Sequence, residues 1–287
     1  MSSPHYPGQL REVHMTDSHI PIVHQVFASR LMERFGSEKD SLSKTQVLDL
    51  GCGRGEQIVY MRRLGFQMSG CDVNSDHLEL ARLALKGQDG TSADVRLQKA
   101  PTELPFETGR FHAVYSNGVF EHCAELPTLF AEVSRVLTPG GVFLAAFPLR
   151  SVLIEPHLGL PFVHRFSKGW MQRLMIRTTS YLFRGRTDMN CQSIERYLQN
   201  EVFYWTGPQV RQILHRHFEQ TNSLAKGYLR AAKNQKQRSP LFRFALGTTA
   251  VPLISSILEH LVSSQWTYII EATKSLGRKE TGFPERL

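Results

Sequence analysis

The sequence predicts an α/β fold, a doubly wound and mostly parallel sheet of seven strands with helices on both faces. The first observation is the apolar run 47–50, which leads directly into a turn with glycines at every second position, Gly51, Gly53 and Gly55. This pattern is typical of a strand that is buried on both faces and ends in a ligand-binding turn. The second observation is that strand-like and helix-like patterns alternate after this turn.

Each element is predicted by hydrophobic spacing and by its end signals. The strands are expected at about 46–50, 66–71, 95–97, 111–116 and 142–147, from 218 onward, and at 266–272. The helices are expected at about 20–35, 55–64, 77–82, 126–137 and 206–217. Asn74, Ser75 and Asp76 each offer N-cap chemistry for the helix at 77–82, Thr206 and Gln209 resemble a capping box, and 139–141 (Pro-Gly-Gly) is expected to close the fourth of these helices.

The chain is expected to divide into four parts. Residues 1–44 form an N-terminal segment with a packing helix, and 45–150 form the ligand-binding core. Residues 151–205 lack period-2 strands and are interpreted as an insertion over the active face. Residues 206–287 complete the sheet and carry a basic and apolar helical insertion at about 226–262. Helical insertions are therefore expected after strand five and before strand seven.

Charge and cysteine content limit the kind of protein. The net charge is +8, with −2 in residues 1–150 (15 basic, 17 acidic) and +10 in residues 151–287 (19 basic, 9 acidic). The N-terminus has no apolar stretch after a basic start, so a cytoplasmic location is expected. The four cysteines are far apart and have no zinc-site spacing, so they are expected to be reduced, and no metal is expected.

The basic excess is concentrated next to an apolar segment. Residues 226–243 contain six basic residues and no acidic one, and 244–258 are uncharged. That segment is shorter than the roughly 20 residues of a membrane helix and contains Pro252. It is interpreted as a lid for an apolar acceptor, a patch that contacts anionic membrane, or a helix packed on the core.

Asp72 follows the second expected strand, about twenty residues beyond the glycine turn. A carboxylate there can accept hydrogen bonds from both ribose hydroxyls of an adenosine, or it can simply cap a turn. The glycine spacing does not match the G-x-G-x-x-G pattern of dinucleotide-binding proteins, and a Tyr-x-x-x-Lys pair is missing. An oxidoreductase is therefore disfavoured.

The segment VLDLGCGRGE resembles motif I of class I S-adenosylmethionine (SAM)-dependent methyltransferases. The segments APTELPF, FHAVYSNGVFEH and RVLTPGG, in residues 100–141, resemble later motifs of that superfamily in the same order. The resemblance covers roughly 45–148 and indicates the small-molecule branch, similar to ubiquinone and menaquinone biosynthesis methyltransferases with a type 11 domain. It implies a Rossmann-like fold and SAM as cofactor, with S-adenosylhomocysteine as product.

The resemblance also implies a cofactor site. Asp49 and the glycine turn would surround the amino acid end of SAM, Asp72 would bind its ribose, and Ala100 would contact the adenine edge. The cofactor-binding residues it implies are Asp49, Gly51, Cys52, Gly53, Gly55, Asp72, Val73, Ala100, Pro101, Ser116 and Asn117. Two positions depart from the superfamily pattern, because Lys99 and His112 stand where it usually has acidic residues; Lys99 cannot accept a hydrogen bond from adenine.

SAM carries an electrophilic methyl group, so the protein chiefly has to align an acceptor and remove its proton. The resemblance also implies that Glu121 and His122 lie beside the acceptor opening. The candidate bases are His157, His122 and His164, although a single histidine in this position is more often a hydrogen-bonded structural residue. The leading prediction is a methyltransferase acting on a lipid-like, quinone-like or glycan acceptor. A catalytically inactive SAM-binding module is the alternative. The basic C-terminal half could attract RNA phosphates, but its aromatic residues are interleaved with core-type aliphatic residues, so an RNA methyltransferase is less favoured and nucleic acid is not an expected partner. The sequence does not indicate the oligomeric state.

Overall fold

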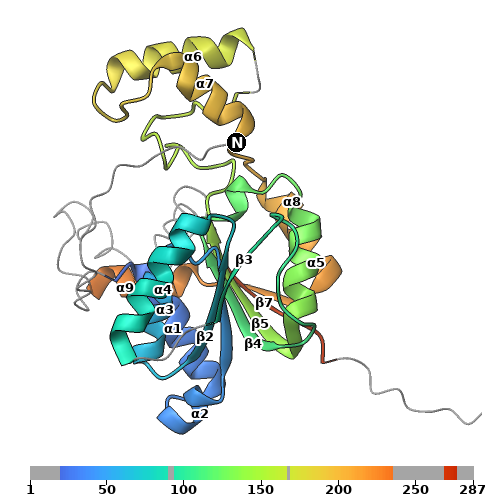
Figure 1. The fold of residues 1–287 in the computed structure, drawn as a ribbon. Coiled ribbons are helices and arrows are strands. Elements are labelled where there is room, and N and C mark those ends of the chain that lie inside the picture. Colours follow the sequence, from blue (N-terminus) through green and yellow to red (C-terminus); the bar gives the residue numbers. More distant parts are fainter. Residues whose placement is uncertain (1–19, 90–93, 167–168, 235–267, 277–287) are drawn as a thin grey trace, which may run out of the picture.

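The computed structural model describes residues 20–89, 94–166, 169–234 and 268–276. Its centre is a seven-stranded sheet of order β3-β2-β1-β4-β5-β7-β6 with helices on both faces (Figure 1). The strands are β1 Gln46–Leu50, β2 Gln67–Asp72, β3 Asp94–Leu97, β4 Phe111–Asn117, β5 Leu137–Phe147, β6 Gln220–Ser223 and β7 Tyr268–Thr273. The pairs among β1 to β5 are parallel, and β7 is antiparallel to both β5 and β6. The predicted doubly wound, mostly parallel sheet is confirmed.

The described residues form nine α-helices, most of which cover the two faces of the sheet. They are α1 Ile22–Phe35, α2 Lys39–Ser43, α3 Glu56–Arg63, α4 Ser75–Asp89, α5 Leu126–Val136, α6 Trp170–Leu182, α7 Cys191–Asn200, α8 Gly207–His217 and α9 Ala225–Asn234, with the short 3₁₀ helix η2 Phe120–His122. Helices α1, α3 and α4 lie on one face, and α5 and α8 lie on the other (Figure 1). The short α2 is a helix that the sequence pattern did not predict.

Strand β1 shows why the sheet is covered on both sides. Its side chains alternate between the two faces, as in any strand. Val47 belongs to the apolar cluster that contains Phe27 of α1. Leu48 and Leu50 belong to the opposite cluster, which contains Phe130 of α5. All of these side chains are at most 1% exposed, so the apolar run before the glycine turn is the centre of two cores.

The structure selects Asn74 among the three cap candidates of α4 and confirms the capping box of α8. The side-chain oxygen of Asn74 accepts hydrogen bonds from the amides of Asp76 and His77 at 2.9 and 3.3 Å. Thr206 and Gln209 form a capping box at the start of α8. These caps satisfy amides that have no partner within the helix.

Strand β5 begins earlier than expected, at Leu137 instead of residue 142. Leu137 pairs with Phe111, and the register then shifts so that Val142 pairs with Ala113. Gly140, with φ of +73°, lies inside this shift. The Pro-Gly-Gly stretch is therefore an irregularity within the strand, because β4 keeps pairing on both sides of it.

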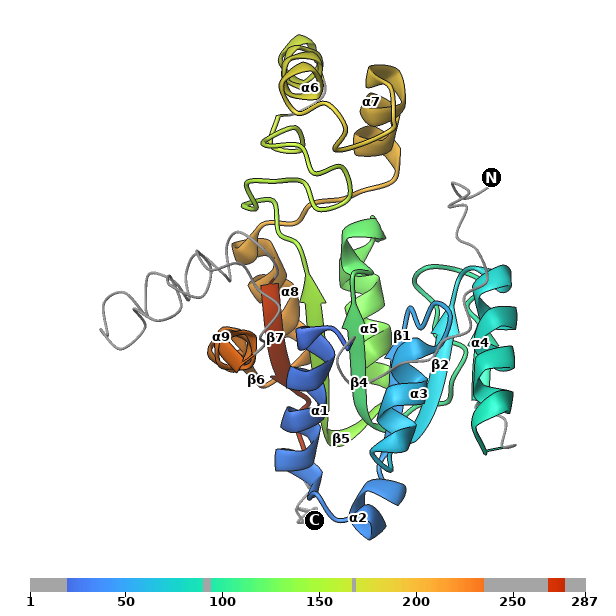
Figure 2. The same cartoon turned by 90° about the vertical axis from the view of Figure 1, so that its left-hand side faces the viewer.

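Residues 151–205 leave the sheet at the end of β5 and contain α6 and α7. Figure 2 shows both helices beyond the end of β5 to which the parallel strands point. They have an apolar cluster of their own, including Leu160, Ile176 and Ile194. The predicted helical insertion after strand five is confirmed, and α9 is helical as expected before strand seven. The remainder of the expected insertion, 235–262, lies outside the described residues.

One charged pair joins the N-terminal helix α1 to strand β7. Glu271 of β7 is 3% exposed and receives two hydrogen bonds from the guanidinium of Arg30 in α1, from Nε and, at 3.0 Å, from Nη2. A buried carboxylate needs such a partner because desolvation of a charge is costly. Within the part of the chain that is described, no helix is both long and apolar enough to cross a membrane.

Candidate active site

The turn between β1 and α3 places three glycines in left-handed conformations, with φ of +76° at Gly51, +50° at Gly53 and +80° at Gly55. A side chain at Gly51 would collide with Val119, and one at Gly55 would press on Ala81 of α4. A Cβ at Gly53 would meet nothing within 4 Å. Gly53 therefore faces open space. Cys52 is buried, so it can offer a ligand only its backbone.

Asp72, the last residue of β2, connects the second strand to the glycine turn. Its Oδ2 accepts a hydrogen bond from the amide of Gly53 at 2.8 Å, and its Oδ1 accepts one from the amide of Asn74 at 2.9 Å. The carboxylate therefore braces two turns at once. Each oxygen keeps a further lone pair, so the same group can also accept hydrogen bonds from a ligand.

Asp49 lies beneath the turn and is 1% exposed. Burial raises the pKa of Asp49 to about 8; the hydroxyl of Tyr115, its Cα partner on β4, lowers that pKa in part, and the charge of Asp72 raises it further. Its Oδ2 has no hydrogen-bond partner within the described residues. A buried carboxyl of this kind is suited to receive a cationic group, which would restore the charged form.

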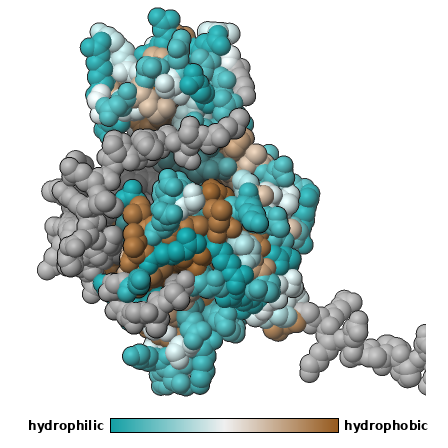
Figure 3. All heavy atoms as spheres, viewed as in Figure 1, coloured by the Kyte–Doolittle hydropathy of each residue, from teal (hydrophilic) through white to brown (hydrophobic). Residues whose placement is uncertain are grey.

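An exposed valine and a short loop follow the ends of β2 and β3. Val73, which follows Asp72, is 57% exposed. Figure 3 shows apolar surface on the body of the molecule, below α6 and α7. The amide of Gln98 donates to the carbonyl of Asp72 at 2.9 Å, and its side-chain nitrogen donates to the carbonyl of Pro101 at 2.9 Å. The buried Gln98 thus ties the 100–103 turn, where Ala100 bridges to Glu103, to the end of β2. Sequence reasoning missed this glutamine and looked only at its exposed neighbour Lys99.

Ser116 and Asn117 end β4. The hydroxyl of Ser116 is fully buried and donates to the carbonyl of Leu50 at 2.8 Å, so it holds β4 to the end of β1. Asn117 is half-buried. The unusual His112 also has a structural partner, because its Nδ1 accepts a hydrogen bond from the amide of Gln46 at 3.1 Å. A ring nitrogen here takes the acceptor role that a carboxylate would otherwise have.

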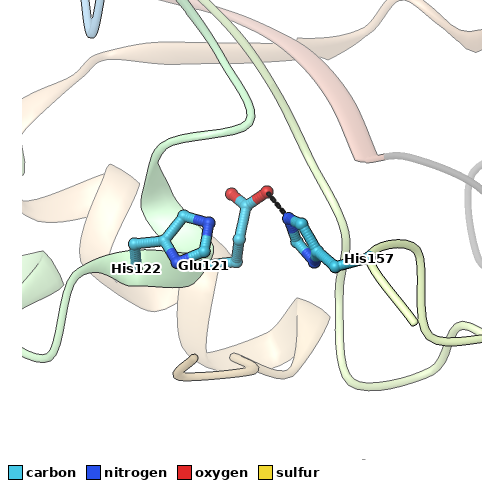
Figure 4. A group of neighbouring side chains, drawn as sticks. All are labelled: Glu121, His122 and His157. Carbon is cyan, nitrogen blue, oxygen red and sulfur yellow. Dashed lines mark ion pairs between the residues drawn. The ribbon is translucent and has the colours of Figure 1, made fainter. Parts of the chain in front are cut away.

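The acceptor-side candidates lie together. Glu121 and His122 of η2 meet His157 from the loop after β5, and one potential ligand atom of each lies within 4.8 Å of those of the other two (Figure 4). Glu121 Oε1 is 4.0 Å from His157 Nε2, and the rings of His122 and His157 are 5.1 Å apart. The structure therefore joins two of the three predicted histidines with a buried glutamate, an arrangement that could hold a metal ion.

In both histidines, the Nδ1 atom is held by a hydrogen bond to an oxygen atom. His157 Nδ1 is 2.9 Å from Glu155 Oε1, and His122 Nδ1 is 2.8 Å from the carbonyl oxygen of Glu201. Glu155 is buried and also accepts hydrogen bonds from the hydroxyl of Tyr204 and the amide of Leu158. In each ring the Nδ1 proton is donated to an oxygen, so the lone pair is on Nε2.

The pKa values of the three cluster residues are shifted in different directions. Burial raises the pKa of Glu121 to about 7. Burial also lowers the pKa of His122. Burial alone would lower the pKa of His157, but the hydrogen bond and charge of Glu155 outweigh it, so the pKa is raised.

His164 is not part of this cluster. It is 7% exposed, burial lowers its pKa, and its ring packs on Tyr204 at 4.7 Å. Its ring contacts Tyr204, whose hydroxyl in turn donates to Glu155 beside the cluster. The sequence could have indicated Glu155, because it stands two residues before His157, whereas Tyr204 is far along the chain and carries no local signal.

Part of the chain is similar in sequence to known proteins. Residues 48–145 match the family described as a methyltransferase domain. The chain is 30% identical over 161 residues, 55% of its length, to malonyl-[acyl-carrier protein] O-methyltransferase of Pectobacterium atrosepticum, and covers 57% of that protein. It is 32% identical over 101 residues, 35% of its length, to ubiquinone biosynthesis O-methyltransferase of Chelativorans sp., and covers 39% of it. The chain thus spans about half, or less, of these relatives.

The fold has a counterpart among solved structures. An S-adenosylmethionine-dependent methyltransferase from Mesorhizobium loti superposes with a TM-score of 0.51 at 16% identity, covering 88% of this chain and 98% of the other. The sheet is thus the Rossmann-like sheet of that class. Residues 48–145 form a class I SAM-dependent methyltransferase domain, as the motifs predicted.

Proposed function

We propose that this chain is a SAM-dependent methyltransferase that transfers a methyl group to a small-molecule acceptor. The observation that carries the proposal is the glycine turn. Gly53 faces open space, and its amide donates a hydrogen bond to Asp72. Gly51 packs against Val119, which is two residues before Glu121. A cofactor held by the turn is thereby next to the residues of the acceptor-side cluster.

The residues present fit the cofactor. Asp49 offers an unpartnered buried oxygen to the ammonium group, Asp72 offers lone pairs to the ribose hydroxyls, and the exposed Val73 offers an apolar surface to the adenine. The glycine turn, the loop after β3 and the end of β4 complete the proposed site, at Gly51, Cys52, Gly53, Gly55, Ala100, Pro101, Ser116 and Asn117. When bound, SAM supplies a methyl group made electrophilic by its sulfonium.

The acceptor would enter between this site and the α6–α7 insertion. We propose that residues 151–205 cover the acceptor, because they extend beyond the end of β5 and contribute His157 to the cluster (Figure 2). Glu121, His122 and His157 would contact the reacting group, and one of them would accept its proton. His164 would act as a positioning residue through Tyr204. The two relatives are named as O-methyltransferases, which favours an oxygen acceptor on a lipid-like, quinone-like or glycan molecule.

Titration calorimetry with SAM and with S-adenosylhomocysteine tests the proposal. The wild type should bind both, and Asp72→Ala should weaken binding at least about tenfold, because each lost charge-assisted hydrogen bond is worth about 1.5–3 kcal/mol. Asp40→Ala is the matched control, since Asp40 is an exposed aspartate that pairs with the exposed Lys44. Folded wild type that binds neither compound would refute the proposal.

Transfer itself needs a separate measurement. Labelled SAM should pass its methyl group to a compound in a fractionated extract of small molecules and lipids. Tight cofactor binding with no labelled product would contradict catalysis and support an inactive SAM-binding module.

We also propose that the protein works in the cytoplasm and touches anionic membranes from there. The half of the chain after residue 150 has a net charge of +10. Helix α6 adds exposed apolar side chains, with Trp170 at 73% and Leu182 at 71% exposure. Residues 169–187 contain four arginines and no acidic residue. Apolar contact and attraction to anionic lipid would then act together.

A further inference from the structure

We propose that Glu121, His122 and His157 bind a divalent transition-metal ion of the zinc type. The site would lie where η2 meets the loop after β5, and its three ligands would come from two segments about 35 residues apart in sequence. The proposal concerns an ion that the sequence alone did not indicate.

The first argument is the orientation of the two imidazoles. A metal-binding histidine almost always donates its other ring N–H to a carboxylate or a backbone carbonyl, which fixes the ring and makes the free nitrogen a better ligand. His157 has the carboxylate of Glu155 in this place, and His122 has the carbonyl of Glu201. Both Nε2 atoms therefore carry lone pairs, and Figure 4 shows the two rings on either side of the Glu121 carboxyl group.

The second argument is the state of Glu121. Its side chain is 2% exposed, and its Oε2 has no hydrogen-bond partner within the described residues. Its Oε1 is 4.0 Å from His157 Nε2, which is too long for a hydrogen bond. Two ligands that are each about 2.1 Å from one metal ion lie at most about 4.2 Å apart, so this separation is compatible with an ion between them. The potential ligand atoms of all three residues lie within 4.8 Å of one another, so the side chains would have to draw together around an ion.

The donor set selects the kind of ion. Two imidazole nitrogens and one carboxylate suit Zn²⁺, Co²⁺, Fe²⁺ or Mn²⁺, whereas Mg²⁺ and Ca²⁺ prefer sites made entirely of oxygen. Three protein ligands leave at least one coordination position open, as in catalytic zinc sites.

Resting on the proposed function, an acceptor hydroxyl would occupy the open position. The ion would lower the pKa of that hydroxyl, so its proton would leave to solvent. The oxygen would keep the electron pair that forms the new bond to the methyl carbon. As that bond forms, the carbon–sulfur bond of the sulfonium breaks and leaves a neutral thioether.

Metal binding can be measured without any activity. Untagged full-length protein, freed of metal by a chelator that is then removed, is titrated with Zn²⁺ by calorimetry and with Co²⁺ by visible absorption. We expect one Zn²⁺ per chain, a Co²⁺ spectrum unlike that of the hydrated ion, and no comparable binding of Mg²⁺. Glu121→Gln, His122→Ala and His157→Ala should each weaken Zn²⁺ binding by at least about 100-fold, and Glu155→Gln by about 10-fold.

His215→Ala is the control, because His215 is an exposed histidine of α8 outside the cluster, and it should leave Zn²⁺ affinity unchanged. Circular dichroism and SAM titration of every variant show whether the fold and the cofactor site persist. Wild type that binds no Zn²⁺ would overturn the proposal, and so would folded cluster variants that bind it as tightly as wild type. Failure to bind SAM would instead refute the proposed function, so the two failures are distinguishable.

Discussion

Gly51 lies directly against Val119, so that a Cβ added to the glycine would come within 2.2 Å of the valine Cγ2. This contact joins the turn after β1 to the segment that leads into η2. Two residues after Val119, Glu121 begins the acceptor-side cluster. The two halves of the proposed active site are thereby held together by packing that leaves no room for a side chain at residue 51.

Substitutions at two glycines should separate stability from ligand binding. Gly51→Ala should lower the free energy of unfolding by about 2–4 kcal/mol, because it adds both left-handed strain and a clash with Val119. Gly53→Ala should cost only about 1–2 kcal/mol, since its space is open, yet it should weaken SAM binding by blocking that space. Urea unfolding and calorimetric titration measure the two effects. Equal loss of stability in both variants would contradict the described packing.

The buried Asp49 should make ligand-free stability depend on pH. Because burial raises its pKa to about 8 from the usual 3.8, the folded state holds its proton more tightly than the unfolded state. This contribution is complete below about pH 4 and is lost as pH rises towards 8. Thermal unfolding from pH 5 to 8 should therefore show wild type losing stability relative to Asp49→Asn. A difference that stays constant across this range would contradict the raised pKa.

Asp49 should also make cofactor binding depend on pH, if its carboxylate receives the ammonium group of SAM. Binding would then release a proton below about pH 8, so affinity should increase as pH rises from 6 to 8. Calorimetry in two buffers of different ionisation enthalpy measures this proton release. Asp49→Asn should abolish it. Release that persists in the variant would place the titrating group elsewhere.

The Arg30–Glu271 pair should be important for stability. Arg30→Ala should lower the free energy of unfolding by about 2–4 kcal/mol, because it leaves a carboxylate buried at 3% exposure without its partner. Arg30 also pairs with Glu33, which is largely exposed, and Glu33→Ala should cost less than about 1 kcal/mol. Urea unfolding of the two variants gives the comparison. Equal costs would show that the buried partner is not the important one.

Membrane contact predicts a dependence on lipid charge. The protein should sediment with liposomes that contain anionic lipid and not with neutral ones, and the bound fraction should fall as salt is added. Trp170→Ala in α6 should reduce binding, whereas Leu83→Ser, which changes a similarly exposed apolar residue of α4, should not. Equal binding to anionic and neutral liposomes would contradict the proposal.

Local patterns predicted most of the sheet and its caps. The run 47–50, the cap at Asn74 and the capping box at Thr206 are short-range signals, and each appears in the structure as expected. The early start of β5 at Leu137 was not predicted, because it depends on pairing with Phe111 across the sheet. Proline and glycine indicate a turn locally, but a neighbouring strand can continue to pair around them.

The candidate site likewise combines features that the local sequence predicts with features that depend on distant segments. The sequence by itself determined the glycine turn and indicated Asp72 and the two histidines of the cluster as candidates, because these residues follow recognisable strands. Only the tertiary structure decided that His157 joins Glu121 and His122 and that His164 does not. It also supplied Glu155, Glu201 and Tyr204 as partners. The physical reason is that strand and turn signals act between near neighbours in the chain, whereas the orientation and charge of a buried side chain are set by groups from distant segments.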